Sequence, residues 1–408
     1  MRYQITACLL GVVLVAASCG GERELRSSII VTDSAGVKIV DNGELDPGLD
    51  LLASPEPTLR IGVVEGAPEY QLFEVSDLKR LSDGGIAVSN AGSRELRIYN
   101  ADGSHRATAG GSGQGPGEFG YPNALFVLGG DTIRVQDRLD RVYFTASGEF
   151  IRRETTDRAK FSALWSATGN SSEGGQWTGD GTLFAPVYHR DQRPPAPGPL
   201  FRPSMLLVRV SADLSRVDTL GEYGGILQQY IDVGGGWGAI PSVPPFSSNT
   251  SWGLGSADGT VVAGDNAAPQ IDRFSPDGSR MIIRWAATAE SGSAAEVEDW
   301  KERLRNAEST RGQLPQLEHA WAVMDVPETK PFYGRVAVGS DGTIWAGPVN
   351  ALVQPTRLMA FSSAGRYLGT IEIAGRFTPY DSGPGWVLGL ARDENDVEFV
   401  QLFALVSR

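Results

Sequence analysis

Apolar and polar residues alternate along most of this chain in short runs, and each run follows a tight turn. In each run, the second and fourth residues after the turn are apolar, as Ile86 and Val88 are in the first. Alternation with period two after an Asp-Gly turn is typical of a strand leaving a β-hairpin. The runs are DGGIAVSN from Asp83, GDTIRVQD from Gly130, DGTLFAPV from Asp180, DGTVVAGD from Asp258 and DGTIWAGP from Asp341.

A second family of turns interleaves with the first, and each of its members follows an apolar run. These turns lie at Asp102, Gly148, Asp213, Asp277 and Gly365. Two hairpin turns per unit predict four antiparallel strands per unit, and five units are visible. A sixth unit is split between residues 376–406 and the amino-terminal run IIVTDSAGVKIVDN. We expect Val37–Val40 to close the ring against the last blade, and the pattern leaves open a split of three strands plus one or two plus two.

Repeated four-stranded units whose ends meet in one unit favour a β-propeller over a sandwich. Closing the ring removes the exposed sheet edges of an open array. The predicted fold is therefore all-β, a six-bladed β-propeller over residues 28–408. An N-terminal strand closes it, and loop insertions and one helical insertion interrupt it.

The sequence resembles the NHL-like six-bladed β-propellers found in many bacterial lipoproteins. The likeness is carried by GQGPGEF (Gly113–Phe119), by the repeated turn-and-strand runs, and by KPFYGRVAVGSDGTIWAG (Lys330–Gly347). It implies the fold over most of residues 28–408. It implies little about function, because propellers include lyases, lactonases, scaffolds and receptors.

The glycine-rich stretch GQGPGEF is repeated, because EGAPEYQLF stands in the same place before the first blade. The two stretches align Glu69 with Glu118 and Tyr70 with Phe119. A link between blades is needed at every blade, whereas a catalytic loop is normally unique. We therefore expect Glu118 to accept hydrogen bonds from loop N–H groups and Phe119 to anchor the link in the core.

Three insertions depart from the regular blades. Residues 189–203 are rich in proline and predict an exposed loop. Residues 224–248 are rich in glycine, and residues 293–319 contain the strongest helical pattern of the body. Insertions on a rigid scaffold usually project from one rim, so we expect all three on one face.

The amino terminus predicts export. Residues 1–18 contain an uncharged apolar run of a length that suits a signal peptide and falls short of a membrane span. The run ends in Ala-Ala-Ser before Cys19, which resembles a bacterial lipobox, so we expect Cys19 to be lipidated and residues 19–27 to be a tether. The alternative is that Cys19 is an ordinary cysteine after a conventional signal peptide.

Composition narrows the class of partner. The chain carries 36 basic and 49 acidic residues, a formal net charge of −13. Such a charge disfavours nucleic acid and anionic lipid surfaces. We therefore expect no nucleic-acid partner and membrane contact only through the lipid anchor. We also expect a monomer.

Enzyme motifs are mostly absent, so no catalytic residue is predicted. The sequence has no G-x-S-x-G elbow and no H-E-x-x-H motif, and its three histidines lie far apart in the chain. Three histidines that lie far apart in the chain disfavour a metal site that depends on histidine, and they disfavour a Ser-His-Asp triad. The sequence leaves catalysis open and favours a protein without it.

Oxygen ligands occur at equivalent strand ends, at Asn90, Asp137 and Asp265. Strand ends of this kind lie near the central channel of a propeller, where oxygens from several blades could hold a hard cation such as Ca²⁺. The alternative, which we favour, is that each side chain caps its own loop by accepting backbone N–H bonds.

Large aromatic residues lie in or beside the glycine-rich insertion, at Tyr230, Trp237 and Trp252. Aromatic side chains are frequent where binding energy is concentrated. We expect them, with the strand-end oxygens, to bind a glycan or a peptide, unless they pack down over the channel. The predicted function is an exported, lipid-anchored binding or scaffolding module of the bacterial cell envelope. The alternative is a metal-dependent propeller enzyme of the lactonase or lyase type.

Overall fold

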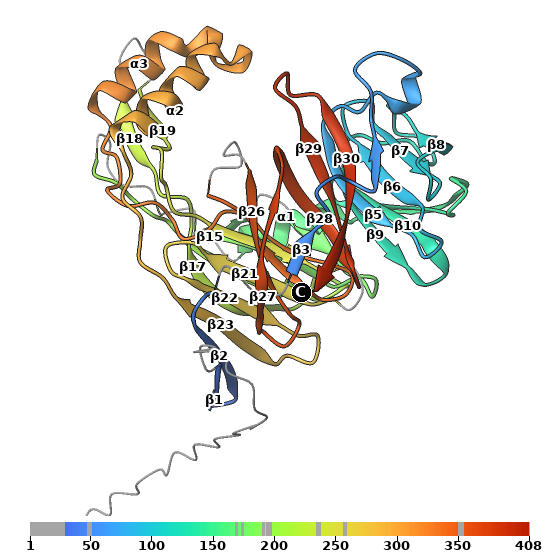
Figure 1. Ribbon diagram of the computed structural model, residues 1–408, viewed down its shortest axis with the longest axis horizontal. Coiled ribbons are helices and arrows are strands. Elements are labelled where there is room, and N and C mark those ends of the chain that lie inside the picture. Colours follow the sequence, from blue (N-terminus) through green and yellow to red (C-terminus); the bar gives the residue numbers. More distant parts are fainter. Residues whose placement is uncertain are drawn as a thin grey trace, which may run out of the picture.

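The computed structural model describes residues 29–407, except 47–50, 168–169, 173–174, 190–191, 193–197, 234–237, 256–258 and 350–354. Within these residues six of the seven sheets are arranged as the blades of a propeller, and the strands of each blade pair antiparallel (Figure 1). The predicted all-β, six-bladed fold is confirmed. A helical arm stands over one face of the ring.

The first three blades follow one another in the chain. Blade 1 contains β5 (Val75–Arg80), β6 (Ile86–Asn90), β7 (Glu95–Tyr99) and β8 (His105–Gly110). Blade 2 contains β9 (Pro122–Leu128), β10 (Thr132–Asp137), β11 (Asp140–Phe144) and β12 (Phe150–Glu154). In blade 3, β13 (Asn170–Ser172) and β14 (Gln176–Trp177) both pair with β15 (Leu183–His189), and β16 (Ser204–Val210) and β17 (Val217–Gly224) follow.

The other three blades lie after the glycine-rich insertion. Blade 4 contains β20 (Thr250–Leu254), β21 (Val261–Asp265), β22 (Gln270–Phe274) and β23 (Arg280–Ala286). Blade 5 contains β24 (Val336–Val338), β25 (Ile344–Ala346), β26 (Thr356–Phe361) and β27 (Tyr367–Ile373). Blade 6 contains β28 (Arg376–Gly383), β29 (Trp386–Arg392) and β30 (Glu398–Ser407). The five aligned runs of the sequence form the second strand of blades 1 to 5, as predicted.

The ring closes through a different strand from the one expected. β3 (Leu51–Ala53) and β4 (Leu59–Ile61) pair with β30, so blade 6 combines three carboxy-terminal strands with one amino-terminal edge. The prediction that Val37–Val40 closes the last blade is wrong. That run belongs to β2 (Val37–Glu44), which lies parallel to β23 at the edge of blade 4 and forms a hairpin with β1 (Ile30–Ser34).

The described parts of the amino-terminal segment, residues 30–46 and 51–61, therefore lie along the outside of three blades, and we call them the strap. Between blades 4 and 5 it is held by Asn42, which is 3% exposed. The side-chain Nδ2 of Asn42 donates to the carbonyl of Gly365 at 3.0 Å, and its Oδ1 accepts from the N–H of Tyr367 at 2.8 Å. The strap thus joins the outer edges of blades 4, 5 and 6.

The core lies between neighbouring blades. Leu78 and Val88 of blade 1 pack against Leu388 of blade 6, and Leu96 packs against Leu125 of blade 2. The side chains of all five are fully buried. Alternation along each strand makes this packing possible, because successive side chains point to the two faces of the blade.

The described parts of the three insertions leave the blades at one face, as predicted, because their strand ends lie opposite the tight turns that precede the second strands. Residues 189–203 join β15 to β16, and residues 224–248 carry a hairpin of β18 (Gln229–Asp232) and β19 (Ala239–Ser242). The glycine-rich insertion leaves beside Asp265, whose Oδ2 accepts the N–H of Gly224 at 3.3 Å.

The helical insertion contains more than one helix. α2 (Ala294–Asn306) begins with a capping box between Ser293 and Glu296, and η3 (Glu308–Gln313) and α3 (Leu314–Val323) follow. A further helix, α1 (Arg158–Ala167), links blades 2 and 3 and was not predicted. None of these described helices is long and apolar enough to cross a membrane.

Residues 293–327 form the arm, which leaves the ring through a short two-stranded neck. The N–H of Gly292 donates to Glu328 O at 2.9 Å, and the N–H of Lys330 donates to Glu290 O at 2.7 Å. At the far end, Gln229 of β18 exchanges hydrogen bonds with Asp325. The arm and the β18–β19 hairpin therefore form one projecting unit (Figure 1).

Candidate functional site

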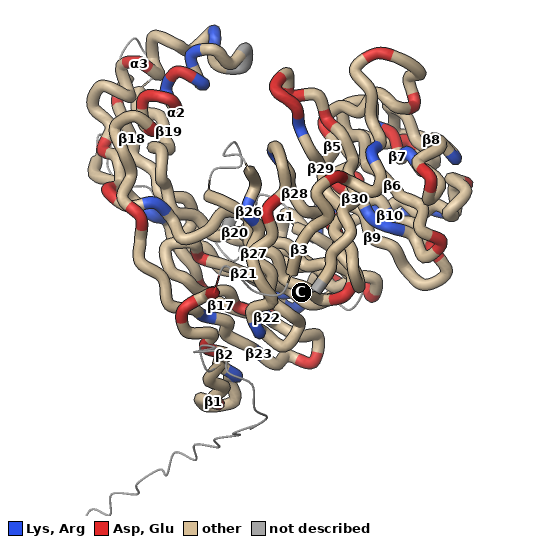
Figure 2. The backbone as a smooth tube through the Cα atoms, viewed as in Figure 1, with Lys and Arg blue, Asp and Glu red and all other residues tan. Residues whose placement is uncertain are grey.

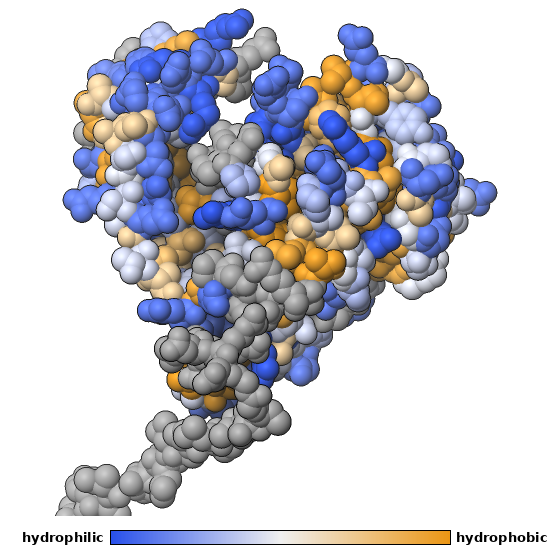
Figure 3. All heavy atoms as spheres, viewed as in Figure 1, coloured by the Kyte–Doolittle hydropathy of each residue, from blue (hydrophilic) through white to orange (hydrophobic). Residues whose placement is uncertain are grey.

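A cleft of about 2120 Å³ separates the arm from the face of the ring. Its walls come from the carboxyl end of α2, the link before blade 1, and the loops of blades 5 and 6. Figure 3 shows the molecule hollowed between the arm and these blades. We call this space the arm cleft.

Exposed apolar side chains from two parts of the chain line the arm cleft. Val64 and Phe73 are each 63% exposed and Val349 is 38% exposed, and all three line the cleft. Phe73 lies against Gly92, where a Cβ would come within 2.1 Å of its ring. The ring is therefore held by a close backbone approach that only glycine permits.

The floor of the cleft includes Tyr380 of β28. A β-bulge lies at Tyr380, because the register of β28 against β29 shifts between Pro379 and Asp381. Bulges re-aim a side chain and are common near functional sites. The carbonyl of Tyr380 accepts a hydrogen bond from Lys79 Nζ at 2.9 Å, and Lys79 is 7% exposed.

Below the floor, Lys79 pairs with Asp77 in the channel at 3.5 Å. Both oxygens of Asp77 also accept backbone bonds, from the N–H of Leu78 and of Leu125 at 2.8 Å each. Burial raises the pKa of Asp77 and outweighs the opposing influence of Lys79 and of the backbone donors. The pair joins the inner strands of blades 1, 2 and 6.

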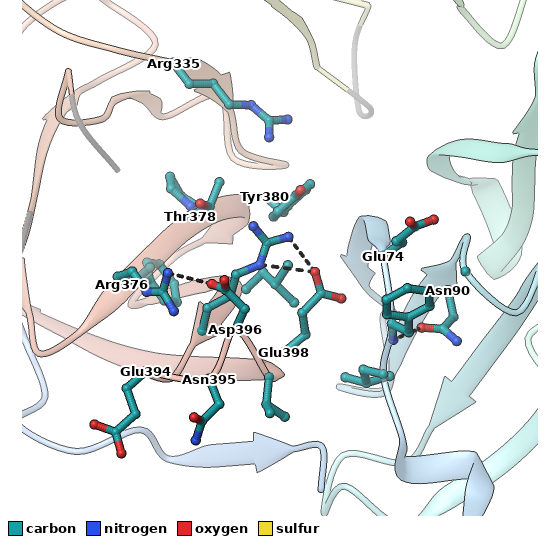
Figure 4. A pocket seen from close by; sticks show the side chains of 18 of the residues that line it. Glu74, Asn90, Arg335, Arg376, Thr378, Tyr380, Glu394, Asn395, Asp396 and Glu398 are labelled. Carbon is teal, nitrogen blue, oxygen red and sulfur yellow. Dashed lines mark hydrogen bonds and ion pairs between the residues drawn. The ribbon is translucent and has the colours of Figure 1, made fainter. Parts of the chain in front are cut away.

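Three arginines of the cleft are neutralised by carboxylates. Figure 4 shows the two pairs on blade 6, Arg376 with Asp396 and Arg392 with Glu398. The three distances are 2.7 Å for Arg376–Asp396, 2.5 Å for Arg392–Glu398 and 2.8 Å for Arg97–Glu95. Glu398 is buried and also accepts the N–H of Val75 at 2.8 Å, so its pair ties blade 6 to blade 1.

Two other arginines of the cleft are exposed and have no carboxylate partner among the residues that the structure describes. Arg335 precedes β24, and its guanidinium carbon lies 4.7 Å from the centre of the Tyr380 ring. Arg303 lies on the last turn of α2. Both line the cleft. Free cations in a partly enclosed space favour an anionic group in whatever binds there.

The predicted strand-end oxygens cap their own loops. Asn90 Oδ1 accepts the N–H of Phe73 at 2.8 Å, and Asp137 accepts the N–H groups of Gly120 and Tyr121 at 3.0 and 2.6 Å. Asp265 accepts the N–H of Ala267 at 3.0 Å. All three side chains therefore accept backbone N–H bonds from their own loops, the alternative favoured from the sequence. Of the three, only Asn90 lines the arm cleft.

The pKa of Asp137 is lowered. Burial raises it, but hydrogen bonds from Tyr121, Gly120 and Arg153 more than offset that effect. Arg153 lies 2.6 Å from one carboxylate oxygen of Asp137 and 3.0 Å from Asp140. Asp137 is therefore held as a charged structural cap.

The structure does not bring the predicted aromatic residues to the arm cleft. Tyr230 is half-buried in β18, and Trp252 of β20 packs against the core cluster that contains Leu254 and Ala263. Neither lines the cleft. Trp237 and Cys19 lie outside the described residues. Ligand binding by Tyr230, Trp237 and Trp252 stays a prediction.

The described residues offer no evident metal centre. Within the part of the chain that the structure describes, no group of three or more His, Cys, Asp or Glu side chains could hold a metal ion. Calcium binding needs six or more oxygen ligands. The oxygens of Asn90, Asp137 and Asp265 are instead engaged by backbone and arginine donors.

The repeated link loop behaves as the sequence indicates. Glu118 Oε2 accepts the N–H of Gly115 at 2.8 Å, and Phe119 is fully buried beside Phe144, with ring centres 5.7 Å apart. Tyr70, the counterpart of Phe119, packs beside Tyr99 at 5.9 Å. Glu118 and Phe119 are therefore structural, as predicted.

Sequence reasoning missed Phe73, Tyr380 and Arg335. The sequence carries a weak signal for Phe73. It directly follows the buried Leu72, so a second large apolar residue stands at a position of the first link that is exposed. Tyr380 and Arg335 come from segments 45 residues apart whose contact depends on how blades 5 and 6 pack. No local pattern marks such a pair.

The comparisons with known proteins give fold-level likeness. No family model matches the chain, and no curated protein matches it. A putative exported protein of Bacteroides fragilis shares 12% identity over 91% of this chain and 99% of its own, with a TM-score of 0.45. A DUF4221 family member from Bacteroides vulgatus shares 10% identity over 88% and 99%, with a TM-score of 0.49. Regucalcin from Agrobacterium tumefaciens, a calcium-binding protein, shares 14% over 86% and 96%, with a TM-score of 0.37.

Proposed function

We propose that this protein is an exported binding module of the bacterial cell envelope that holds an extended peptide in the arm cleft. The observation that carries the proposal is the arm cleft itself, about 2120 Å³ in volume and walled by the arm and three blades. Clefts lined by apolar side chains with a few polar groups are the usual sites of ligand binding. The space exceeds what a small metabolite fills, which favours an extended ligand.

A peptide suits this cleft better than a glycan does. Three exposed apolar side chains, Val64, Phe73 and Val349, share the cleft with free arginines. A peptide offers apolar side chains and carboxylates together. A neutral glycan offers neither, and it is bound mainly by flat aromatic faces and hydrogen bonds.

The alternative, a metal-dependent lactonase- or lyase-type enzyme, receives less support. Among the residues that the structure describes, no group of three or more His, Cys, Asp or Glu side chains could hold a metal ion, and two of the four carboxylates that line the cleft, Asp396 and Glu398, are paired with arginines. Such an enzyme needs an open metal site or a free general base. The binding module needs neither.

The binding test uses short fluorescein-labelled peptides with alternating apolar residues, and neutral oligosaccharides as the competing class. Val349→Trp narrows the cleft and should weaken peptide binding about tenfold or more, a cost of about 1.4 kcal/mol. Val243→Trp is the matched control, because Val243 has a similar exposure of 40% and does not line the cleft. Binding of oligosaccharides alone, or equal peptide binding by both variants, would contradict the proposal.

Membership of the envelope rests on the amino-terminal run and Cys19, as does the proposed lipid anchor. Acylation requires the thiol, so Cys19→Ser should move the protein from the membrane fraction to the soluble fraction or block its processing. Unchanged fractionation would refute the anchor without touching the cleft.

A further inference from the structure

We infer that Arg335, supported by the ring of Tyr380, receives a carboxylate of the ligand, so that the arm cleft selects acidic peptides. This inference rests on the proposed function and names its ligand class. It concerns one pair of side chains, drawn at the top of the close-up in Figure 4.

Arg335 differs from its neighbours in the cleft by its availability. Arg97, Arg376 and Arg392 each donate to a carboxylate within 3.0 Å, whereas Arg335 is exposed and has no such partner among the described residues. Its guanidinium lies 4.7 Å from the Tyr380 ring centre. Stacking on the ring leaves the N–H edge of the guanidinium open, and that edge matches a carboxylate with two parallel bonds.

The backbone holds Arg335 in place. The N–H of Gly347 donates to the carbonyl of Arg335 at 2.9 Å, and the N–H of Gly334 donates to Gly347 O at 2.9 Å. A Cβ at Gly334 would lie 2.1 Å from the carbonyl oxygen of Pro348, so this close approach requires glycine. The cation therefore stands on a fixed segment.

The backbone of Tyr380 is held as well. Tyr380 occupies the bulge of β28, and Lys79 binds its carbonyl from below. Because the backbones of both residues are held before a ligand arrives, only their side chains remain to be ordered on binding.

Asp77 does not form an ion pair with Arg335. The charge of Arg335 acts to lower the pKa of Asp77, but the oxygens of Asp77 are taken by two backbone N–H groups and Lys79. Glu74 and Glu394 also line the cleft, and Figure 4 shows both apart from Arg335. A ligand carboxylate can therefore reach the guanidinium without displacing an existing partner.

The arm cleft is also more positive than the whole protein. Its lining includes five arginines and four carboxylates, whereas the chain as a whole carries a formal charge of −13. Figure 2 shows acidic and basic residues interleaved elsewhere on the ring and on α2. An acidic peptide would thus meet two cations in the cleft, Arg303 and Arg335, that have no carboxylate partner among the described residues.

The experiment measures fluorescence anisotropy with three peptides of one design. The first alternates Leu and Glu and has an amidated carboxyl end, the second replaces every Glu by Gln, and the third is the Gln peptide with a free terminal carboxylate. The wild-type protein should bind the Glu peptide about tenfold more tightly than the amidated Gln peptide, the scale of one charged hydrogen-bonded contact. Tight binding of the third peptide would show that the protein recognises a carboxylate at the chain end. Tight binding of the first peptide alone would show that it recognises the carboxylates of side chains.

Arg335→Gln should abolish the preference while leaving the affinity for the amidated Gln peptide unchanged. Arg366→Gln is the matched control, an exposed arginine outside the cleft. Arg335→Lys keeps the charge without the bidentate edge and should retain only part of the preference. Equal melting temperatures of the variants show that folding is intact.

The outcomes separate this inference from the proposed function. Equal binding of Glu and Gln peptides by the wild type, or a preference that survives Arg335→Gln, overturns the role of Arg335 and leaves peptide binding in place. Failure of every peptide to bind overturns the proposed function and this inference together.

Discussion

The two links that precede blades 1 and 2 share one design and differ in what they face. Residues 62–74 form the first link and residues 111–121 the second. Each places an aromatic ring against the last residue of the third strand of the blade that it leads into, Tyr70 on Tyr99 and Phe119 on Phe144. Each is then tied by a strand-end side chain, Asn90 or Asp137.

The second link is closed on itself. Glu118 caps its own loop, Phe119 is fully buried, and Asp137 is paired with Arg153. The first link is tied by the neutral Asn90 and leaves Phe73 exposed to the arm cleft. Repetition thus identifies the structural part of a link, and only the neighbourhood of each copy decides whether it can also bind.

The two links should differ most in how much free energy of unfolding is lost when their aromatic anchors, Tyr70 and Phe119, are removed. Phe119→Ala removes a fully buried ring and should lower the free energy of unfolding by about 3–5 kcal/mol. Tyr70→Ala removes a half-buried ring and should cost about 1–3 kcal/mol. Urea unfolding of the two variants measures both values. Equal costs would show that the links are anchored alike.

The strand-end caps should differ in their dependence on pH. Asp137→Asn should lower the free energy of unfolding by about 1–3 kcal/mol at neutral pH, because a charged acceptor of three donors is lost. The pKa of Asp137 is lowered in the folded state from its usual 3.8, so its contribution is present above that value and disappears as the pH falls through the folded pKa.

The wild-type and Asp137→Asn curves should therefore converge in acid. Asn90→Ala, which removes a neutral cap, should cost the same amount at every pH. Thermal unfolding between pH 2 and pH 7 distinguishes the pH dependence of these two variants. A range of about two pH units on either side of the usual pKa of an aspartate is wide enough to show it. Parallel curves for Asp137→Asn would contradict a charged cap.

The two loop glutamates, Glu118 and Glu69, should differ less in what their replacement does to stability. Glu118→Gln keeps an acceptor for the N–H of Gly115 but loses its charge, and should cost about 0.5–1 kcal/mol. Glu69 has no hydrogen-bond partner for its side chain within the described residues, so Glu69→Gln should leave the unfolding midpoint unchanged. A matched loss in both would mean that the charge of the loop, rather than the hydrogen bond, is what matters.

The smallest effect on stability should come from the exposed aromatic residues at the ends of the two links. Phe73→Ala and Tyr121→Ala should each change the free energy of unfolding by less than about 0.5 kcal/mol, because Phe73 is 63% exposed and Tyr121 is 47% exposed. Only Phe73 lines the arm cleft. Peptide affinity should fall in Phe73→Ala alone, and a loss in Tyr121→Ala would place the ligand elsewhere.

Local patterns predicted the blades well. The second strands of blades 1 to 5 each follow a tight turn and alternate over a few residues, so Ile86 and Val88 could be placed without knowing what they touch. The same holds for Glu118 and Phe119, because the repeat separates link geometry from chemistry. These features depend on contacts near in sequence.

Features that depend on distant contacts were not predictable in the same way. Val37–Val40 and Leu59–Ile61 are both short apolar runs, and only packing assigns the first to blade 4 and the second to blade 6. α1 is fixed by Trp165, which packs into the core of blade 3. The aromatic residues of the glycine-rich insertion carried no sign of whether they face solvent, and Trp252 packs inward.

The closure of blade 6 sets the order in which this ring can be completed during synthesis. Ser54 and Ala404, which exchange hydrogen bonds across the closure, are 350 positions apart in the chain. The strap is made first, yet β3 and β4 have no partner until the final strand leaves the ribosome. Contacts of such separation slow folding, and unpaired edges that wait for them invite association with other chains. A factor that shields the strap during that interval would raise the yield of native protein without altering its final stability.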